Sequence, residues 1–257
     1  MKRLLTILPV LTLMVAGCNP DPFADFIIEP NPAYVGEDIL FTNVSDHAQS
    51  AEWTMGDGSV SSAYNVTHFY YDPGFYNVTL KAFGKRSGVS TLVREVEVIG
   101  SELKIEVRDY DTDVRIEGAS VVLFATLDDW FDADYDNIVN DDEQFTNSAG
   151  VCYFDNLSYQ EYYVDVYYRV GNEGYVNWLL GEDDVFFIET QQLPGGFDHT
   201  FIAYVEPVTF DEKKSATTST GRPVIRPPLR DPGTTLKSAG AERTHKENKF
   251  SEKRTDR

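Results

Sequence analysis

The chain has 257 residues and a formal net charge of −20 at pH 7, with 42 acidic and 22 basic side chains. Such an excess of carboxylates repels phosphates, so a nucleic-acid partner is excluded. Signature motifs of nucleotide-binding loops, zinc proteases and serine hydrolases are missing from the sequence. A thiol enzyme would need a histidine base for its cysteine, and no histidine of the chain lies in a local signature of that kind.

Residues 1–17 carry the features of an export signal. Two basic residues are followed by an apolar run, residues 4–15, that is too short to span a membrane stably. The run ends in Val-Ala-Gly-Cys, which resembles the bacterial lipobox, and this resemblance implies that Cys18 is diacylated and becomes the new N-terminus. Several acyl chains would anchor the protein to a membrane leaflet. The alternative is an ordinary secretory signal. With Cys18 lipidated, residues 18–25 are expected to form a short tether.

Residues 26–100 are predicted to form a domain of short strands. Gly56-Asp57-Gly58 and Pro73-Gly74 are turn signals, because glycine adopts positive φ at little cost. Side chains alternate between two faces over residues 75–82, which is the period of a half-buried strand. The expected strands are 39–43, 51–55, 66–70, 75–82 and 91–98.

These turns and their neighbours resemble the PKD (polycystic kidney disease) domain, an immunoglobulin-like β-sandwich common in surface proteins. Its signature is a W-D-F-G-D-G turn followed by an H-x-Y…P-G-x-Y-x-V-x-L strand. The matching residues are Trp53, Gly56, Asp57, Gly58, His68, Tyr70, Pro73, Gly74, Tyr76, Val78 and Leu80. Thr54 and Met55 depart from the usual Asp and Phe. The resemblance covers residues 26–99 and implies an extracytoplasmic setting, without catalysis or a particular ligand.

A second domain is expected over residues 101–207. This part of the chain resembles the carboxypeptidase-regulatory-like, or prealbumin-like, β-sandwich, whose members are non-catalytic. The family's pattern is G-A-x-V-x-L, then T-x-x-x-G-x-V-x-F-x-x-L, then Y-x-V. The match is carried by Gly118, Ala119, Val121, Leu123, Thr146, Gly150, Val151, Tyr153 and Leu157. The fold class expected for the chain is therefore all-β, with two tandem immunoglobulin-like or prealbumin-like β-sandwiches.

An acidic loop at residues 132–143 has the ligand spacing of an EF-hand, with acids at positions 1, 3, 5 and 12. The expected calcium ligands are the side chains of Asp132, Asp134, Asp136 and Glu143 and the backbone carbonyl of Ile138. Asn137 stands where glycine is usual, and no flanking helices are evident. The alternative is a solvated acidic loop, because carboxylate runs arise by chance in so acidic a chain. No other cofactor is expected.

Four aromatic residues of the second domain are candidates for ligand contact: Trp130, Tyr163, Tyr167 and Trp178. Tyr163 and Tyr167 share one strand face, opposite Val164 and Val166. If the valine face is the core, the tyrosines are exposed and could stack on sugar rings. The alternative is that tyrosine is simply a good strand former whose hydroxyl reaches water.

The composition changes sharply at the end of the second domain. Residues 18–210 hold 35 acidic and 8 basic side chains, whereas residues 211–257 hold 7 acidic and 12 basic ones. The region 208–257 has few large apolar residues, so we expect a disordered basic tail. Such a tail could be simply solvated, lie on an acidic surface such as its own body, or result from a shifted reading frame. Cys152 lies in an expected strand and is interpreted as a small buried hydrophobe.

The sequence therefore predicts a lipid-anchored protein of the bacterial cell envelope, with the outer membrane as the expected membrane. It is predicted to be a non-catalytic adhesion or binding module with a carbohydrate or envelope protein as partner. A structural spacer, or an accessory subunit of an envelope complex, is the alternative. Large exposed aromatic patches would favour binding, and a uniformly polar surface would favour a spacer.

Overall fold

The computed structural model describes residues 20–86, 88–171, 173–177 and 188–208, and short strands at 216–217, 223–224 and 251–254. The expected export signal, Cys18, Trp178 and the rest of the expected tail lie outside the described residues. The chain divides into two units: residues up to 27 with 41–66 and 77–94, and residues 28–40 and 67–76 with the chain from 95 onward. No helix among the described residues is long and apolar enough to cross a membrane.

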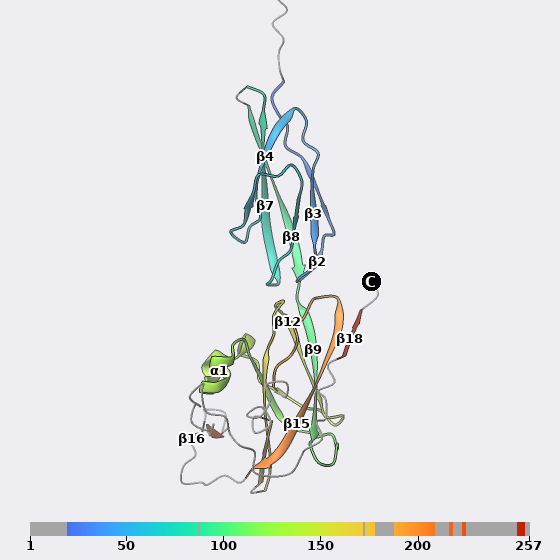
Figure 1. The fold of residues 1–257 in the computed structure, drawn as a ribbon, viewed down its shortest axis with the longest axis vertical. Coiled ribbons are helices and arrows are strands. Elements are labelled where there is room, and N and C mark those ends of the chain that lie inside the picture. Colours follow the sequence, from blue (N-terminus) through green and yellow to red (C-terminus); the bar gives the residue numbers. More distant parts are fainter. Residues whose placement is uncertain are drawn as a thin grey trace, which may run out of the picture. The chain divides into compact units, whose positions relative to one another are not determined.

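The architecture is all-β, as the sequence predicts. Residues 26–99, which we call the first sandwich, form two sheets (Figure 1). The smaller sheet has the order β1 (Phe26–Glu29), β3 (Ile39–Asn43) and β6 (Val66–His68). The larger has the order β2 (Ala33–Tyr34), β8 (Val89–Ile99), β7 (Gly74–Gly84), β4 (Ala48–Thr54) and β5 (Val60–Ser61). All five expected strands are present, with ends that differ by a few residues.

Trp53 lies at the centre of the first sandwich. Its side chain is fully buried, and its indole N–H donates to the carbonyl of Ala63 at 3.0 Å. The ring meets those of Phe26 and Phe41 edge-on, with centroids 5.1 and 6.2 Å away. The turn that follows uses positive φ at Gly56 (91°) and Gly58 (95°), as the turn chemistry predicts.

Residues 101–208, which we call the second sandwich, form one continuous path of strands (Figure 1). The order is β11 (Gln144–Phe145), β10 (Ser120–Phe124), β13 (Tyr163–Val170), β14 (Glu173–Val176), β15 (Phe197–Val208), β9 (Ser101–Asp109) and β12 (Val151–Leu157). β15 is long enough to pair with β9 along most of its length and with β14 at its end. It therefore joins the two layers of the sandwich.

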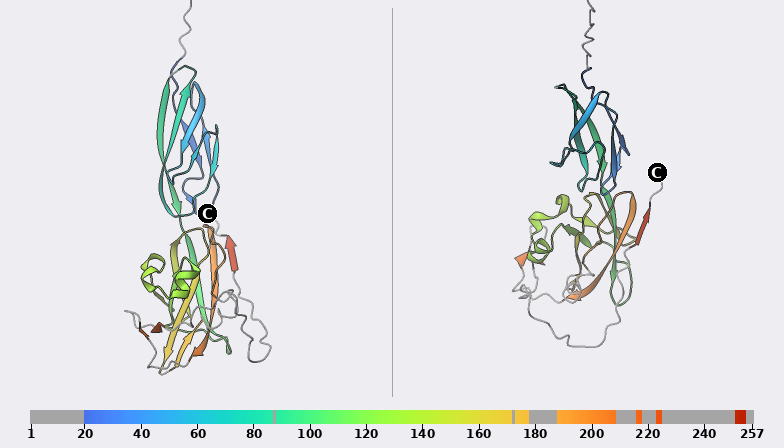
Figure 2. Two further views of the ribbon diagram at one scale, coloured as in Figure 1. Left: turned by 60° about the vertical axis from the view of Figure 1, so that its left-hand side comes forward. Right: turned by 45° about the horizontal axis from the view of Figure 1, so that its top comes forward.

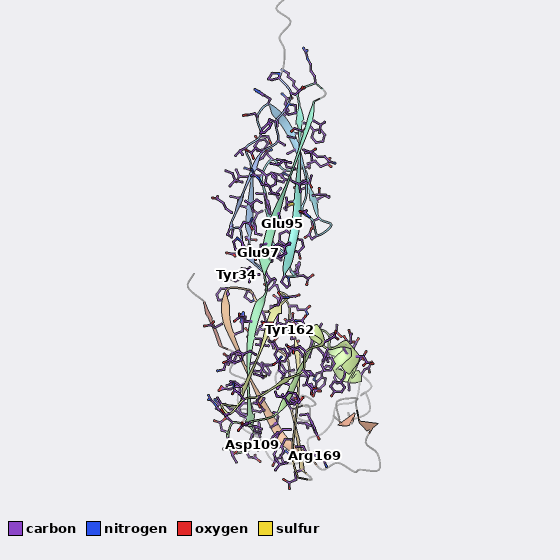
Figure 3. The ribbon with its side chains drawn as sticks, turned by 180° about the vertical axis from the view of Figure 1, so that it is seen from behind. Tyr34, Glu95, Glu97, Asp109, Tyr162 and Arg169 are labelled. Atoms are coloured by element: carbon purple, nitrogen blue, oxygen red, sulfur yellow. The ribbon has the colours of Figure 1, made fainter. Side chains whose placement is uncertain are left out.

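A single apolar core fills the space between these layers. Leu103, Ile105 and Val107 enter it from β9, and Val164 and Val166 enter it from β13. Figure 3 shows Tyr162 near one end of the second sandwich, and Asp109 and Arg169 at the other end, where β9 and β13 finish. Cys152 is buried in this core, which confirms its interpretation as a buried hydrophobe. Burial and the nearby Asp142 raise the pKa of its thiol to about 12.

Residues 127–141 add a layer of helices outside the strands. It consists of α1 (Leu127–Asp132) and two 3₁₀ helices, η1 (Tyr135–Asn137) and η2 (Val139–Asp141). Figures 1 and 2 show α1 on the outer side of the second sandwich. We call residues 127–141 the helical cover.

The described part of the basic tail forms three short strands. β16 (Ala216–Thr217) pairs with β17 (Pro223–Val224), and β18 (Ser251–Arg254) pairs with β15. The composition of the tail did not predict these strands.

Candidate functional site

The helical cover begins at a well-formed N-cap. The hydroxyl of Thr126 accepts a hydrogen bond from the backbone N–H of Asp129 at 3.1 Å, and two aspartates lie in the first turn of α1. The helix ends at Ala133, whose φ of 50° is left-handed. This local geometry turns Trp130 inward, and its indole N–H donates to the carbonyl of Val164 at 3.2 Å.

Trp130 fills a second apolar cluster, which lies between the cover and the strands β10 and β13. Its fully or largely buried members are Val122, Phe124, Trp130, Val176 and Ile188. Tyr163 and Tyr167 are partly buried against it. The structure thus brings together three of the four aromatic residues that the sequence singled out.

The sequence predicts exposed tyrosines if the valine face of β13 is the core; Tyr163 and Tyr167 are only partly exposed, and a role in ligand contact stays a prediction for them and for Trp130. Only 2% of the Trp130 side chain is accessible, and Tyr163 and Tyr167 are partly covered. The valine face of β13 is the core, as expected, but the opposite face is covered as well. Trp130 therefore presents no ring face to a ligand in solution. Trp178 lies outside the described residues, so its role stays a prediction.

Polar groups within the second cluster are paired with one another. Asp165 is 1% exposed and accepts a hydrogen bond from the hydroxyl of Tyr135 at 2.5 Å. The hydroxyl of Tyr163 donates to Glu189 at 2.9 Å. Burial, together with this carboxylate, raises the pKa of Tyr163 to about 12. Asn177 is buried and bonds the backbone of β13 through both ends of its amide, at Val164 and Val166. Of these contacts, the bond between Tyr135 and Asp165 joins the cover to β13.

The acidic loop does not have the local structure of an EF-hand. Asp132 ends α1, while Asp134 and Asp136 belong to the cap and body of η1. Left-handed backbone occurs at Asn140 and Asp141 and not at Asn137. The described residues contain no group of three or more His, Cys, Asp or Glu side chains that could hold a metal ion.

Glu143 is engaged elsewhere, because its carboxylate accepts a hydrogen bond from the hydroxyl of Ser120. Calcium binding through Asp132, Asp134, Asp136, Ile138 and Glu143 would need these groups to move together, and it stays a prediction. Titration calorimetry with calcium, beside the Asp132→Ala/Asp134→Ala variant, tests it.

Besides Phe131 on α1, which is 39% accessible, two aromatic side chains among the described residues of the second sandwich are exposed. Phe145 is 60% and Tyr153 is 59% accessible. They lie on β11 and β12, two strands joined by a turn at residues 147–150. We call Phe145 and Tyr153 the aromatic pair.

The aromatic pair rests on a well-anchored turn. The backbone N–H of Asn147 donates to the carbonyl of Val151 at 2.9 Å, and Gly150 has a φ of 71°. Thr146 is buried and donates its hydroxyl to the carbonyl of Ile116 at 2.7 Å. Tyr153 lies directly across from Lys104 in the pairing of β12 with β9. Residues 151–154 are all apolar, so no alternation in the sequence marks Tyr153 as the outward residue of this strand.

A network of charges covers the outer face of β9 beyond Lys104. Glu106 is 4% exposed and receives hydrogen bonds from Arg115 and, at 3.2 Å, from Arg108. Arg108 also reaches Asp113 at 2.9 Å. Two guanidinium groups thus compensate the buried carboxylate, so this network is structural.

Comparison with known families identifies the first sandwich. The PKD domain model matches residues 19–99. A PKD domain therefore occupies this part of the chain. The match includes the range 26–99 that the two turn motifs predicted and begins directly after Cys18. No curated protein matches the chain. The assignment of the second sandwich to the carboxypeptidase-regulatory-like type stays a prediction.

Solved structures that are similar include two PKD1 domains from Vibrio species. That of Epp from Vibrio anguillarum is 26% identical, covers 31% of this chain and 95% of that chain, and has a TM-score of 0.28. That of the metalloprotease PrtV from Vibrio cholerae is 24% identical, covers 31% of this chain and 98% of that chain, and has a TM-score of 0.27. A structure described for carbohydrate-binding modules of the β-sandwich superfamily is 17% identical, covers 62% of this chain and 58% of that chain, and has a TM-score of 0.32.

Proposed function

We propose that the chain is a lipid-anchored, non-catalytic binding module of the bacterial cell envelope, and that the second sandwich binds a neutral polysaccharide through the aromatic pair. The observation that carries this proposal is the exposure of Phe145 and Tyr153, each about 60% accessible, on two adjoining strands. An exposed aromatic side chain offers an apolar ring face, and the hydroxyl of Tyr153 adds a hydrogen-bonding group, so the two residues can contact a ligand that is partly apolar and partly polar.

The surroundings of Tyr153 favour a sugar as the ligand. Lys104 is its cross-strand neighbour, and Asp155 is exposed on the same strand. A ring that stacks on a sugar, with charged groups nearby that bond hydroxyls, is a common arrangement for polar ligands of this class. Residues 18–210 carry 35 acidic and 8 basic side chains, so an acidic polysaccharide would be repelled.

The membrane anchor is proposed from the sequence around Cys18. The small residues that precede it follow an apolar run in the register of a lipobox, and the PKD domain begins at the next residue. In the bacterial host, Cys18→Ser should abolish incorporation of radiolabelled palmitate and release the chain from the membrane fraction or leave an unprocessed precursor. Equal labelling of the variant would contradict the anchor, without bearing on polysaccharide binding.

A glycan array tests the ligand class. The chain with Cys18→Ser is compared with a variant that also carries Phe145→Ala and Tyr153→Ala. Phe131→Ala is a matched control, because Phe131 is a 39% exposed aromatic residue on α1, away from the pair. Binding of neutral glycans should survive in the control and disappear in the double variant. An array without any specific signal would favour the structural spacer.

A further inference from the structure

The C-terminal strand β18 completes the edge of a sheet in the second sandwich. It runs antiparallel to β15, with Cα partners Phe197–Arg254, Asp198–Lys253, His199–Glu252 and Thr200–Ser251. Figures 1 and 2 show β18, in red, beside the beginning of β15, in orange. Residues 209–250 separate the two strands along the chain.

The edge that β18 covers has no other strand in the described part of the protein. β9 pairs with the opposite side of β15, from Asp198 to Val205, and β14 reaches β15 only at Glu206 to Val208. Without β18, the backbone N–H and C=O groups at the start of β15 would be open on one side. An open edge of this kind accepts another strand readily, because the main-chain ladder is largely independent of sequence.

One pair in this register, Asp198 with Lys253, joins residues of opposite charge. Asp198 has Glu102 as its neighbour on β9 and Lys253 as its neighbour on β18. The tail that supplies β18 is basic, with 12 basic and 7 acidic residues from 211 to 257, whereas residues 18–210 are strongly acidic. Opposite charges directly across a strand pair stabilise it, and two acidic residues side by side favour a basic third strand.

We propose that this edge also accepts β18 from a second copy of the chain, so that copies are joined by exchange of the C-terminal strand. A strand contributed by another copy makes the same contacts as the chain's own strand. The chain's own β18 and the β18 of a second copy therefore compete for the same edge. The outcome depends on the effective concentration of the chain's own β18, which falls as the connecting segment lengthens. The sequence places 42 residues, 209–250, between β15 and β18, the paired strands β16 and β17 among them.

The exchange gives each copy one donor strand and one acceptor edge. Mutual donation closes a dimer, and donation to a third copy extends a row. Such a row of copies would suit a crowded surface, where the local concentration of neighbours is high. The proposal does not depend on the polysaccharide ligand.

Single cysteines placed on different copies test the exchange. One full-length chain carries Asp198→Cys and another carries Lys253→Cys, both with Cys18→Ser, and they are mixed in mild detergent and oxidised. Directly opposite residues of antiparallel strands have Cα atoms about 4.5–5.5 Å apart, within the span of a disulfide. Cys152 is buried and does not compete. We expect a 198–253 linked dimer, identified by mass spectrometry, whose fraction rises with protein concentration.

Further variants define the controls. Asp155→Cys replaces Asp198→Cys as an exposed position on β12 and should give no specific dimer with Lys253→Cys. Glu252→Pro in the donor removes a backbone N–H within β18 and should reduce the linked dimer, whereas Glu252→Ala should not. A chain that carries both Asp198→Cys and Lys253→Cys reports the pairing within one copy. An internal disulfide in this chain, with no linked dimer in the mixture at any concentration, would overturn the proposal. Absence of both products would overturn the strand pairing on which it rests.

Discussion

At the scale of single residues, two glycines share a positive φ but should differ in how much a substitution by alanine destabilises the protein. Gly58 and Gly150 both have positive φ, of 95° and 71°. A Cβ on Gly58 would meet nothing within 4 Å, whereas a Cβ on Gly150 would lie 2.7 Å from the Cβ of Arg115. Gly58→Ala should therefore lower the free energy of unfolding by about 1 kcal/mol, through backbone strain alone. Gly150→Ala should cost more, because strain and a clash add. Urea unfolding followed by circular dichroism measures both, and equal losses would contradict the role of the clash.

Tyr163 should make the free energy of unfolding depend on pH in the alkaline range. Its pKa is raised from 10.0 to about 12, mainly by burial and then by the carboxylate of Glu189. A tyrosine whose pKa is higher in the folded state contributes its stability fully below pH 10, and this contribution is lost as the pH rises from 10 to 12. The free energy of unfolding of Tyr163→Phe should therefore fall less over this range than that of the unchanged protein. Parallel curves for the two proteins would show that Tyr163 is not held in a desolvated setting.

At the scale of elements, the helical cover matters most for the stability of the second sandwich. It packs on the outer face of β10 and β13 and so forms a second core with these strands. Trp130 is the side chain that links the cover to the strands. Trp130→Ala should lower the free energy of unfolding of the second sandwich by about 3–5 kcal/mol. Phe131→Ala, at the neighbouring position, should cost less, about 1 kcal/mol, because Phe131 is 39% exposed and contacts Trp130 only edge-on, with ring centroids 5.2 Å apart. Chemical denaturation distinguishes the two, and a small loss for Trp130→Ala would place its ring outside the cluster.

The elements that the sequence predicted well are those with local signals. The glycine turn beside Trp53 and the alternation along β7 depend on neighbours in sequence, and both occur where expected. The cover could not be predicted in the same way. A period of two shows which residues share a face of β13, but not that a second layer will cover Tyr163, Asp165 and Tyr167. α1 has six residues, too few for a helical period to be recognised.

At the scale of the whole molecule, the aromatic residues expected to bind a ligand are not the ones that are exposed. The helical cover, which the sequence does not predict, is the reason. The sequence predicts that Trp130, Tyr163 and Tyr167 lie in loops or on an outer face, and the cover buries or partly covers them. Phe145 and Tyr153 are the aromatic residues that remain available on the second sandwich beside its anchored turn. The acidic spacing in residues 132–143 likewise arises in a segment that folds as helices around this second core.

The proposed function requires that the ring of Tyr153 contacts a neutral polysaccharide. Calorimetric titration with the best glycan from the array tests it most directly, with the Cys18→Ser chain and its Tyr153→Phe and Tyr153→Ala variants. Tyr153→Phe keeps the ring and should retain most of the affinity. Tyr153→Ala removes it and should weaken binding by about tenfold or more, equivalent to about 1.4 kcal/mol. Equal affinities for all three proteins would contradict the claim and place the binding surface elsewhere.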